Sequence, residues 1–302
     1  MRVTQRSIAL TSLQGLNRNQ EAVAKLQQQL TSGRSISKPS DDPTGTNAAM
    51  QTRQEIAGAK QYARNISDGM SQLDATDSAL QSMVTQLHRV RALTLQGANG
   101  GAMSDASRAA ISTEVAGIRD SLLALANTTV QGQPIFGGVT SGPTAYDPTT
   151  GTYQGVGGAA GASFPVTRQV SDTDSVRIDV TGPEAFGEST STSRDLFQLV
   201  GDIADHAVSD PGSLAGDLDG LDEALDRLLG AASDIGTRTN RMETAQQLNA
   251  DLQLTLTSRS AEIEDVDLAK TIMYLNMQQT SYEAALSATA KVIQPTLADF
   301  LR

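Results

Sequence analysis

The sequence predicts a mainly helical protein: an elongated antiparallel rod or coiled coil built from both chain ends, with a small central β domain. Three observations predict this class. Near both ends, apolar residues recur at alternating steps of three and four, the spacing of a coiled-coil seam. A stretch rich in Gly, Thr and Ser separates two helical halves. Aromatic residues make up only 3 % of the 302 residues, and thin seams of Leu, Ala, Ile and Val need few of them.

Residues 1–42 are predicted to form an N-terminal assembly helix. Its narrow stripe comprises Leu13, Leu16, Gln20, Val23, Gln27 and Leu30. Because such a stripe is too narrow to build a domain alone, we expect this helix to pair with residues 261–302 and with copies of itself. Gln20 and Gln27, together with Gln279 of the C-terminal stripe described below, leave two interpretations open, a solvated helix face or buried amides that set the register between subunits.

A structural turn is predicted at Asp41-Asp42-Pro43, just before the longest helical pattern. Asp is a favoured N-cap and Pro is favoured in the first turn of a helix, so the long helix is expected to begin here. Residues 43–135 then form the N-terminal half of the helical rod domain. Its long helix runs to about residue 98, and Ser104 and Asp105 are expected to cap a third helix.

The central part, residues 136–193, is predicted to be a small β insert domain. Residues 144–153 have the pattern of a strand, a turn and a strand. Val176, Ile178 and Val180 alternate with Arg177 and Asp179, which predicts a half-buried strand. Helical periodicity is lost throughout this segment.

Helix returns in residues 194–260, the C-terminal half of the rod domain, with a break at Asp210-Pro211-Gly212. Residues 261–302 are predicted to form the C-terminal assembly helix. Its stripe comprises Leu268, Ile272, Leu275, Gln279, Tyr282, Leu286, Thr289 and Ile293. The candidate assembly interface therefore consists of Leu13, Leu16, Val23, Leu30, Leu268, Ile272, Leu275, Tyr282, Leu286 and Ile293.

The composition argues against several classes of partner. A formal charge of −11 disfavours nucleic acid and anionic membrane surfaces, both of which attract Lys and Arg patches. No run of eighteen apolar residues is present, so no membrane-spanning helix is expected. Residues 1–10 lack an apolar core segment, so we expect no cleaved signal peptide. The absence of Cys excludes disulfides and thiol catalysis.

We expect no catalytic, cofactor or metal site, and no enzyme activity. The only two histidines, His88 and His206, are scattered and assemble no triad with Ser and Asp. Acidic residues cluster twice, but neither cluster has the fixed ligand spacing of a calcium loop. These residues are Asp172 and Asp174, and then Asp217, Asp219, Asp222, Glu223 and Asp226.

Four segments, in order, resemble the flagellin-like family of bacterial flagellar axial proteins. They are LTSGRSISKPSDDPTGTNA at 30–48, LANTTVQGQPIFGG at 125–138, IGTRTNRM at 235–242 and DVDLAKTIMYLNMQQTSYEAALSATAKVIQPTLADFL at 265–301. In that family the third segment is the turn into the last long helix. Within it, the Pro-Ser-Asp-Asp-Pro form of residues 39–43 resembles the hook–filament junction subfamily, hook-associated protein 3, more than flagellin itself.

The resemblance implies a structural axial protein that polymerises in a ring-like layer at the hook–filament junction and provides a platform for flagellin. It implies hook-associated protein 1, flagellin and a flagellar export chaperone as partners. It also implies an extracellular location on the flagellum, reached through the flagellar type III export system without a cleaved signal peptide.

Three alternatives remain. The nearest is flagellin itself, the filament subunit of the same family. A cytoplasmic signalling coiled coil shares the low aromatic content but does not account for the β insert. An acidic extracellular enzyme ranks last because the sequence contains no residue constellation to carry chemistry.

Overall fold

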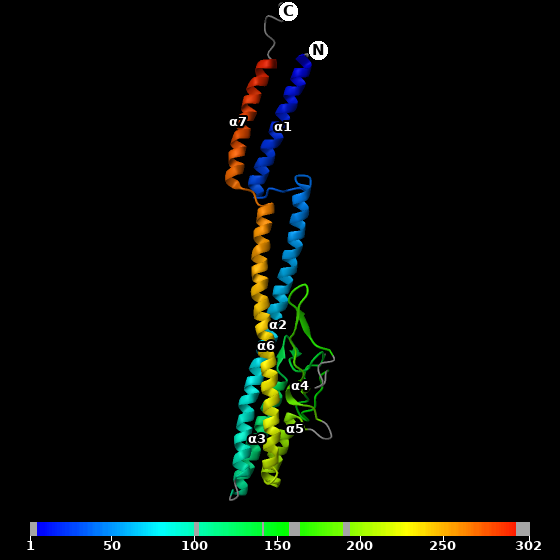
Figure 1. Ribbon diagram of the computed structural model, residues 1–302, viewed down its shortest axis with the longest axis vertical. Coiled ribbons are helices and arrows are strands. Elements are labelled where there is room, and N and C mark those ends of the chain that lie inside the picture. Colours follow the sequence, from blue (N-terminus) through cyan, green and yellow to red (C-terminus); the bar gives the residue numbers. More distant parts are fainter. Residues whose placement is uncertain (1–4, 100–102, 141, 157–163, 190–193, 294–302) are drawn as a thin grey trace, which may run out of the picture. The chain divides into compact units, whose positions relative to one another are not determined.

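A computed structural model describes residues 5–99, 103–140, 142–156, 164–189 and 194–293; residues 5–9 and 291–293 are described by their backbone alone. The described chain is dominated by helices (Figure 1). The helices are α1 (Gln5–Ser32), α2 (Pro43–Ala98), α3 (Asp105–Ala126), α4 (Gly182–Phe186), α5 (Leu196–Ser209), α6 (Leu214–Glu264) and α7 (Leu268–Ile293). The strands are β1 (Thr129–Val130), β2 (Gln133–Pro134), β3 (Thr167–Gln169) and β4 (Ser175–Arg177). The predicted class, mainly helical with a small central β insert, is confirmed.

The chain divides into two compact units. The terminal unit comprises residues 1–58 and 252–302, and the central unit comprises residues 59–251. The terminal unit thus joins both ends of the chain, as the matching stripes predict. In the described part of the chain, no helix is long and apolar enough to cross a membrane.

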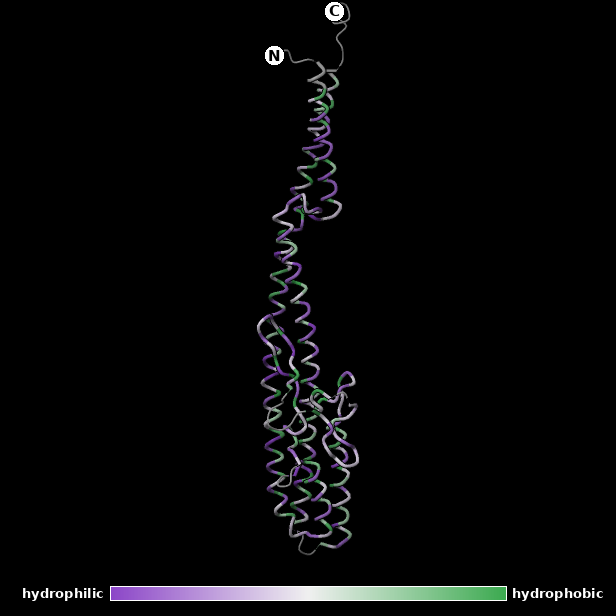
Figure 2. Tube along the Cα trace, turned by 90° about the vertical axis from the view of Figure 1, so that its right-hand side faces the viewer, coloured by the Kyte–Doolittle hydropathy of each residue, from purple (hydrophilic) through white to green (hydrophobic). Residues whose placement is uncertain are grey.

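In the terminal unit, α1 and α7 lie side by side and run antiparallel (Figures 1 and 2). The hydropathy colours alternate along both helices in Figure 2, as an amphipathic pair requires. α1 ends at Ser32, and Gly33 follows with φ +69°, the left-handed conformation that commonly terminates a helix.

The segments that leave α1 and enter α7 also pair with each other. Ser35 N donates to Glu264 O at 2.7 Å and Val266 N donates to Gly33 O at 3.0 Å. Arg34 and Asp265 thereby form an isolated antiparallel bridge. This short ladder holds the segment that follows α1 against the segment that precedes α7.

The core of the central unit lies between α2, α3, α5 and α6. On α2, the fully buried side chains include Ile66, Leu73, Leu80, Leu87 and Val90, which keep the four- and three-residue spacing. α3 begins at the predicted N-cap, because the Ser104 side chain accepts a hydrogen bond from Ser107 N. The sequence therefore predicts the start of α3.

The β insert contains two short hairpins. β1 pairs with β2 and β3 pairs with β4, both antiparallel. Five of the protein's ten aromatic rings pack together here, one of them from α5, with centroids 4.8–5.7 Å apart and mostly edge-to-face packing. The cluster comprises Phe136, Tyr146, Tyr153, Phe186 and Phe197.

Three details differ from the sequence-based expectations. Residues 144–153 form a single bridge, Tyr146 to Tyr153, instead of a regular hairpin. Asp179 is buried instead of facing solvent, because its carboxylate accepts hydrogen bonds from Val166 N and Arg177 Nε, each at 2.9 Å. Residues 235–242 do not form a turn: they lie inside α6, where Ile235 and Met242 are both buried on one face.

Candidate functional site

The candidate site is the pair of terminal helices with the turn beside it. In the α1–α7 pair, the half-buried and buried positions follow a regular four-three spacing on each helix. On α1 they include Ser12, Leu16, Asn19, Val23, Leu26 and Leu30; on α7 they are Thr271, Leu275, Gln278, Tyr282, Ala285 and Thr289. We call these two sets the intrachain seam.

Half of the predicted interface residues belong to this seam. Leu16, Val23, Leu30, Leu275 and Tyr282 are half-buried in it. The others described by their side chains are exposed: Leu13 at 46 %, Leu268 at 54 %, Ile272 at 49 % and Leu286 at 42 %. The backbone of Ile293 ends α7, and its side chain lies outside the described residues.

The exposed members form a second stripe next to the seam. On α7 it comprises Leu268, Ile272, Gln279 and Leu286. On α1 it comprises Leu13, Gln20 and Gln27. We call this the outer stripe. Large apolar side chains that are exposed together on one side of a helix are a common feature of interaction surfaces.

One polar pair crosses the intrachain seam. Gln278 Nε2 donates a hydrogen bond to Asn19 Oδ1 at 3.1 Å. A polar layer in an apolar seam penalises other registers, since a shifted helix leaves an amide unsatisfied. Gln20, Gln27 and Gln279, which the sequence offers as register-setting amides between subunits, are all exposed in the single chain. Within the chain, the polar layer is formed by the neighbouring amides Asn19 and Gln278.

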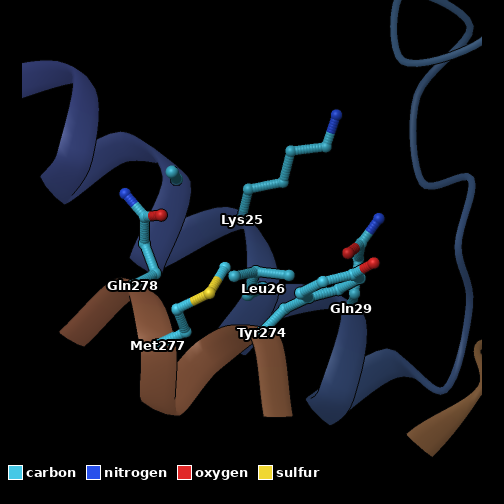
Figure 3. A pocket seen from close by; sticks show the side chains of 7 residues that line it. Lys25, Leu26, Gln29, Tyr274, Met277 and Gln278 are labelled. Carbon is cyan, nitrogen blue, oxygen red and sulfur yellow. The ribbon is translucent and has the colours of Figure 1, made fainter. Parts of the chain in front are cut away.

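A shallow cavity of about 340 Å³ lies over the seam where α1 and α7 meet (Figure 3). α1 contributes Ala22, Lys25, Leu26 and Gln29, and α7 contributes Tyr274, Met277 and Gln278. In Figure 3 the Leu26, Tyr274 and Met277 side chains line its floor, while the Lys25 chain extends away. The cavity is therefore a mainly apolar hole that is bordered by polar groups, suited to a side chain from another helix.

The predicted structural turn is held by both of its aspartates. The Asp41 carboxylate pairs with Lys25 Nζ at 3.1 Å and accepts hydrogen bonds from Ser37 and from Lys38 N. These donors, with Lys25 the foremost, hold the pKa of Asp41 at about 2. The turn is therefore tied to α1 throughout the physiological pH range.

Asp42 and Pro43 start α2 as the sequence analysis expects. Asp42 Oδ1 accepts from Thr44 N at 3.1 Å and from Gly45 N at 3.0 Å, which is N-cap geometry with Pro43 at the first helical position. A Cβ at Gly45 would collide with the Asp42 carboxylate and with Ile36. The capped turn is thus too tightly packed for a larger residue there.

A second ion pair closes the same region. Arg53 of α2 donates to both carboxylate oxygens of Glu264, the last residue of α6, at 2.7 and 2.6 Å. The Glu264 side chain is only 7 % exposed, and Arg53 lowers its pKa. The sequence carries no local signal for this pair, because its partners are 211 residues apart.

The candidate chemical groups of the sequence lie apart from this site. His88 is exposed on α2. His206 Nδ1 lies 2.6 Å from Asp217 Oδ2, and Arg194 Nη1 lies 3.1 Å from the other oxygen of the same carboxylate. Asp217 is buried, and its hydrogen bond raises the pKa of His206. Within the described ranges, no three His, Cys, Asp or Glu residues are grouped as a metal site.

Two family models match the chain at its two ends. The bacterial flagellin N-terminal helical region matches residues 3–141, and the bacterial flagellin C-terminal helical region matches residues 218–301. Together they account for about three quarters of the chain, including both terminal helices and the turn. The unmatched part contains most of the β insert.

Similar proteins match along nearly the whole length. The chain is 28 % identical to flagellar hook-associated protein 3 of Escherichia coli over 311 residues, 95 % of this chain and 96 % of that one. It is also 28 % identical to flagellin of Bacillus subtilis, over 97 % of both chains. A solved flagellar hook-associated protein from Vibrio parahaemolyticus shares the fold, with a TM-score of 0.65 at 21 % identity, covering 74 % of this chain and 100 % of that one.

Proposed function

This chain belongs to the bacterial flagellin family, and on that premise we propose that it is the structural axial protein of the hook–filament junction. In this role it polymerises into a layer and provides the platform on which flagellin assembles. It acts by burying surface and not by catalysis. The observation that carries the proposal is the match to hook-associated protein 3 over 95 % of the chain, together with the exposed outer stripe.

The outer stripe is the surface that copies of the chain would cover in such a layer. Apolar burial stabilises by roughly 25 cal/mol per Å², and the stripe presents several large side chains at once. The intrachain seam brings α1 and α7 together, and the turn at Asp41 and Asp42 holds the pair's connection to α2. Assembly then needs no further folding step in the seam itself.

Hook-associated protein 1 and flagellin are the proposed neighbours on the two sides of the layer. A flagellar export chaperone is a third proposed partner, because the outer stripe is apolar and needs cover before assembly. Export through the flagellar type III system, without a cleaved signal peptide, would deliver the chain to the extracellular end of the growing structure. These partners and this route rest on the family to which the chain belongs.

The proposal is tested by locating the tagged chain in isolated flagella and by the phenotype of cells that lack the chain. Cells that lack the chain should build hooks but release flagellin into the medium, and the restored, tagged chain should sit at one position between hook and filament in isolated flagella. Tagged protein distributed along the filament, or normal filaments without the chain, would contradict the proposal.

Flagellin itself is the second candidate, favoured by the 28 % identity to the Bacillus subtilis filament protein over 97 % of both chains. The two candidates differ in copy number. A filament subunit is present in thousands of copies per flagellum, whereas a junction layer needs only a few. Quantification of the tagged chain per isolated flagellum therefore separates them.

A further inference from the structure

A cationic groove lies beside the structural turn, within the terminal unit. Its volume is about 420 Å³, and it is separate from the cavity over the α1–α7 seam. The segment between α1 and the structural turn supplies Arg34, Ile36, Ser37, Lys38 and Pro39. Helix α2 supplies Thr46, Ala49, Met50 and Arg53, and the lining is completed by Ser32 and Glu264. We call it the turn groove.

The turn groove combines apolar walls with an excess of positive charge. Ile36 is half-buried, Ala49 is buried and Met50 is 56 % exposed, so part of the wall is an uncovered apolar surface. Of the three cations, Arg53 is hydrogen-bonded to the one carboxylate of the groove, Glu264, and the nearby charge of Arg34 also lowers the pKa of Glu264. Among the described residues, the side chains of Arg34 and Lys38 have no salt-bridge partner, and both residues are exposed.

Such a groove selects an acidic, partly apolar polypeptide. A cationic groove opposes metal ions. A carboxylate placed between Arg34 and Lys38 would gain two charge-assisted hydrogen bonds, and a neighbouring apolar side chain would cover Met50.

The charge of the chain is divided unevenly between its units, which indicates where such a segment comes from. Residues 59–251 contain 12 Lys and Arg against 24 Asp and Glu, a formal charge of −12. Residues 1–58 and 252–302 together contain 11 against 10, a formal charge of +1. Two copies therefore attract each other where the terminal unit of one meets the central unit of the next, and repel where two central units meet.

We propose that the turn groove binds an acidic segment from residues 59–251 of a second copy of this chain. The inference rests on the proposed function, which places copies side by side, and it adds the residues and the chemistry of one contact between them. In that contact, Arg34 and Lys38 provide the specificity for carboxylates, and Met50 and Ile36 provide the apolar surface. The Arg53–Glu264 pair keeps the groove's wall in place.

The contact can be tested by photo-crosslinking in isolated flagella. A photoreactive amino acid replaces Met50 in the full chain, and the matched control replaces Gln51, which is exposed and points away from the groove by helix geometry. After irradiation, the Met50 variant should yield a chain–chain adduct, and mass spectrometry should map the captured peptide to residues 59–251. The Gln51 variant should yield much less of it.

Charge reversal in the same background provides the second measurement. Arg34→Glu with Lys38→Glu should lower the adduct yield about tenfold, because like charges then face each other. The conservative pair Arg34→Lys with Lys38→Arg should retain it.

The outcomes separate the two levels of the proposal. Absence of the chain from purified flagella would overturn the proposed function and this contact with it. Presence of the chain without an adduct above the Gln51 level would overturn the contact alone. Capture of a different protein, or of residues 1–58 or 252–302, would also overturn it.

Discussion

Leu286→Asp is the sharpest test of the outer stripe. Leu286 lies on α7, is 42 % exposed and is not part of the seam with α1. Leu275, eleven residues earlier on the same helix, is half-buried in that seam. The two leucines therefore separate what holds the single chain together from what holds copies together.

The expected magnitudes follow from these burials. Fully burying a Leu side chain is worth about 1.5–3 kcal/mol, so replacing one that is already 42 % exposed should lower the single chain's stability by roughly 1 kcal/mol. In an assembled layer the same carboxylate would be buried without a partner, which costs on the order of several kcal/mol at every copy. Assembly should therefore fail while the subunit remains folded.

The assay combines motility, filament counts and the flagellin released into the medium. Cells with only Leu286→Asp should export the variant but lose filaments and release flagellin. Glu283→Gln, exposed on the same helix, is the matched control and should be tolerated. Leu275→Asp should instead destabilise the α1–α7 pair in the purified chain. Normal filaments on Leu286→Asp cells would refute the assignment of the outer stripe to assembly.

Three further predictions concern the interior contacts. Arg53→Ala should lower the free energy of unfolding by about 1–3 kcal/mol, because it leaves the buried Glu264 carboxylate without its donor. Amide hydrogen exchange at residues 33–35 and 264–266 should then accelerate, and unchanged exchange would contradict this prediction. Asp217 raises the pKa of His206 in the folded state. The His206–Asp217 ion pair therefore stabilises the folded chain fully below pH 6.5, and this contribution is lost as the pH rises through the raised pKa. His206→Gln should therefore lower Tm more at pH 6 than at pH 9, and an equal loss at both would reject the linkage. Gln278→Leu should leave the helix content of the purified chain unchanged but weaken the register of α1 against α7, which spin-label distances between the two helices would report as a broadened distribution.

The sequence by itself determined most of the local structure. Ser104 caps α3, Asp42 and Pro43 begin α2, and the break at residues 210–212 separates α5 from α6, because capping and chain breaking depend on residues within one turn of each other. The outcome at residues 235–242 shows the limit of arguing from a family's pattern. Residues 235–242 bury Ile235 and Met242 on one face and lie within α6, so the helix continues through them.

Only the tertiary structure decided which stripe of each terminal helix faces the other. A spacing of alternating three and four residues does not identify one stripe, because the same spacing can start at any residue of the helix. Each residue is turned by about 100° from the one before it, so each start gives a stripe on a different side. The partner helix makes the choice, and it selects Asn19, Leu26 and Gln278 and leaves Leu13 and Leu286 in water. Contacts between residues some 200 positions apart, such as Arg53 with Glu264, have no signal in local sequence, since they form only when both ends of the chain meet.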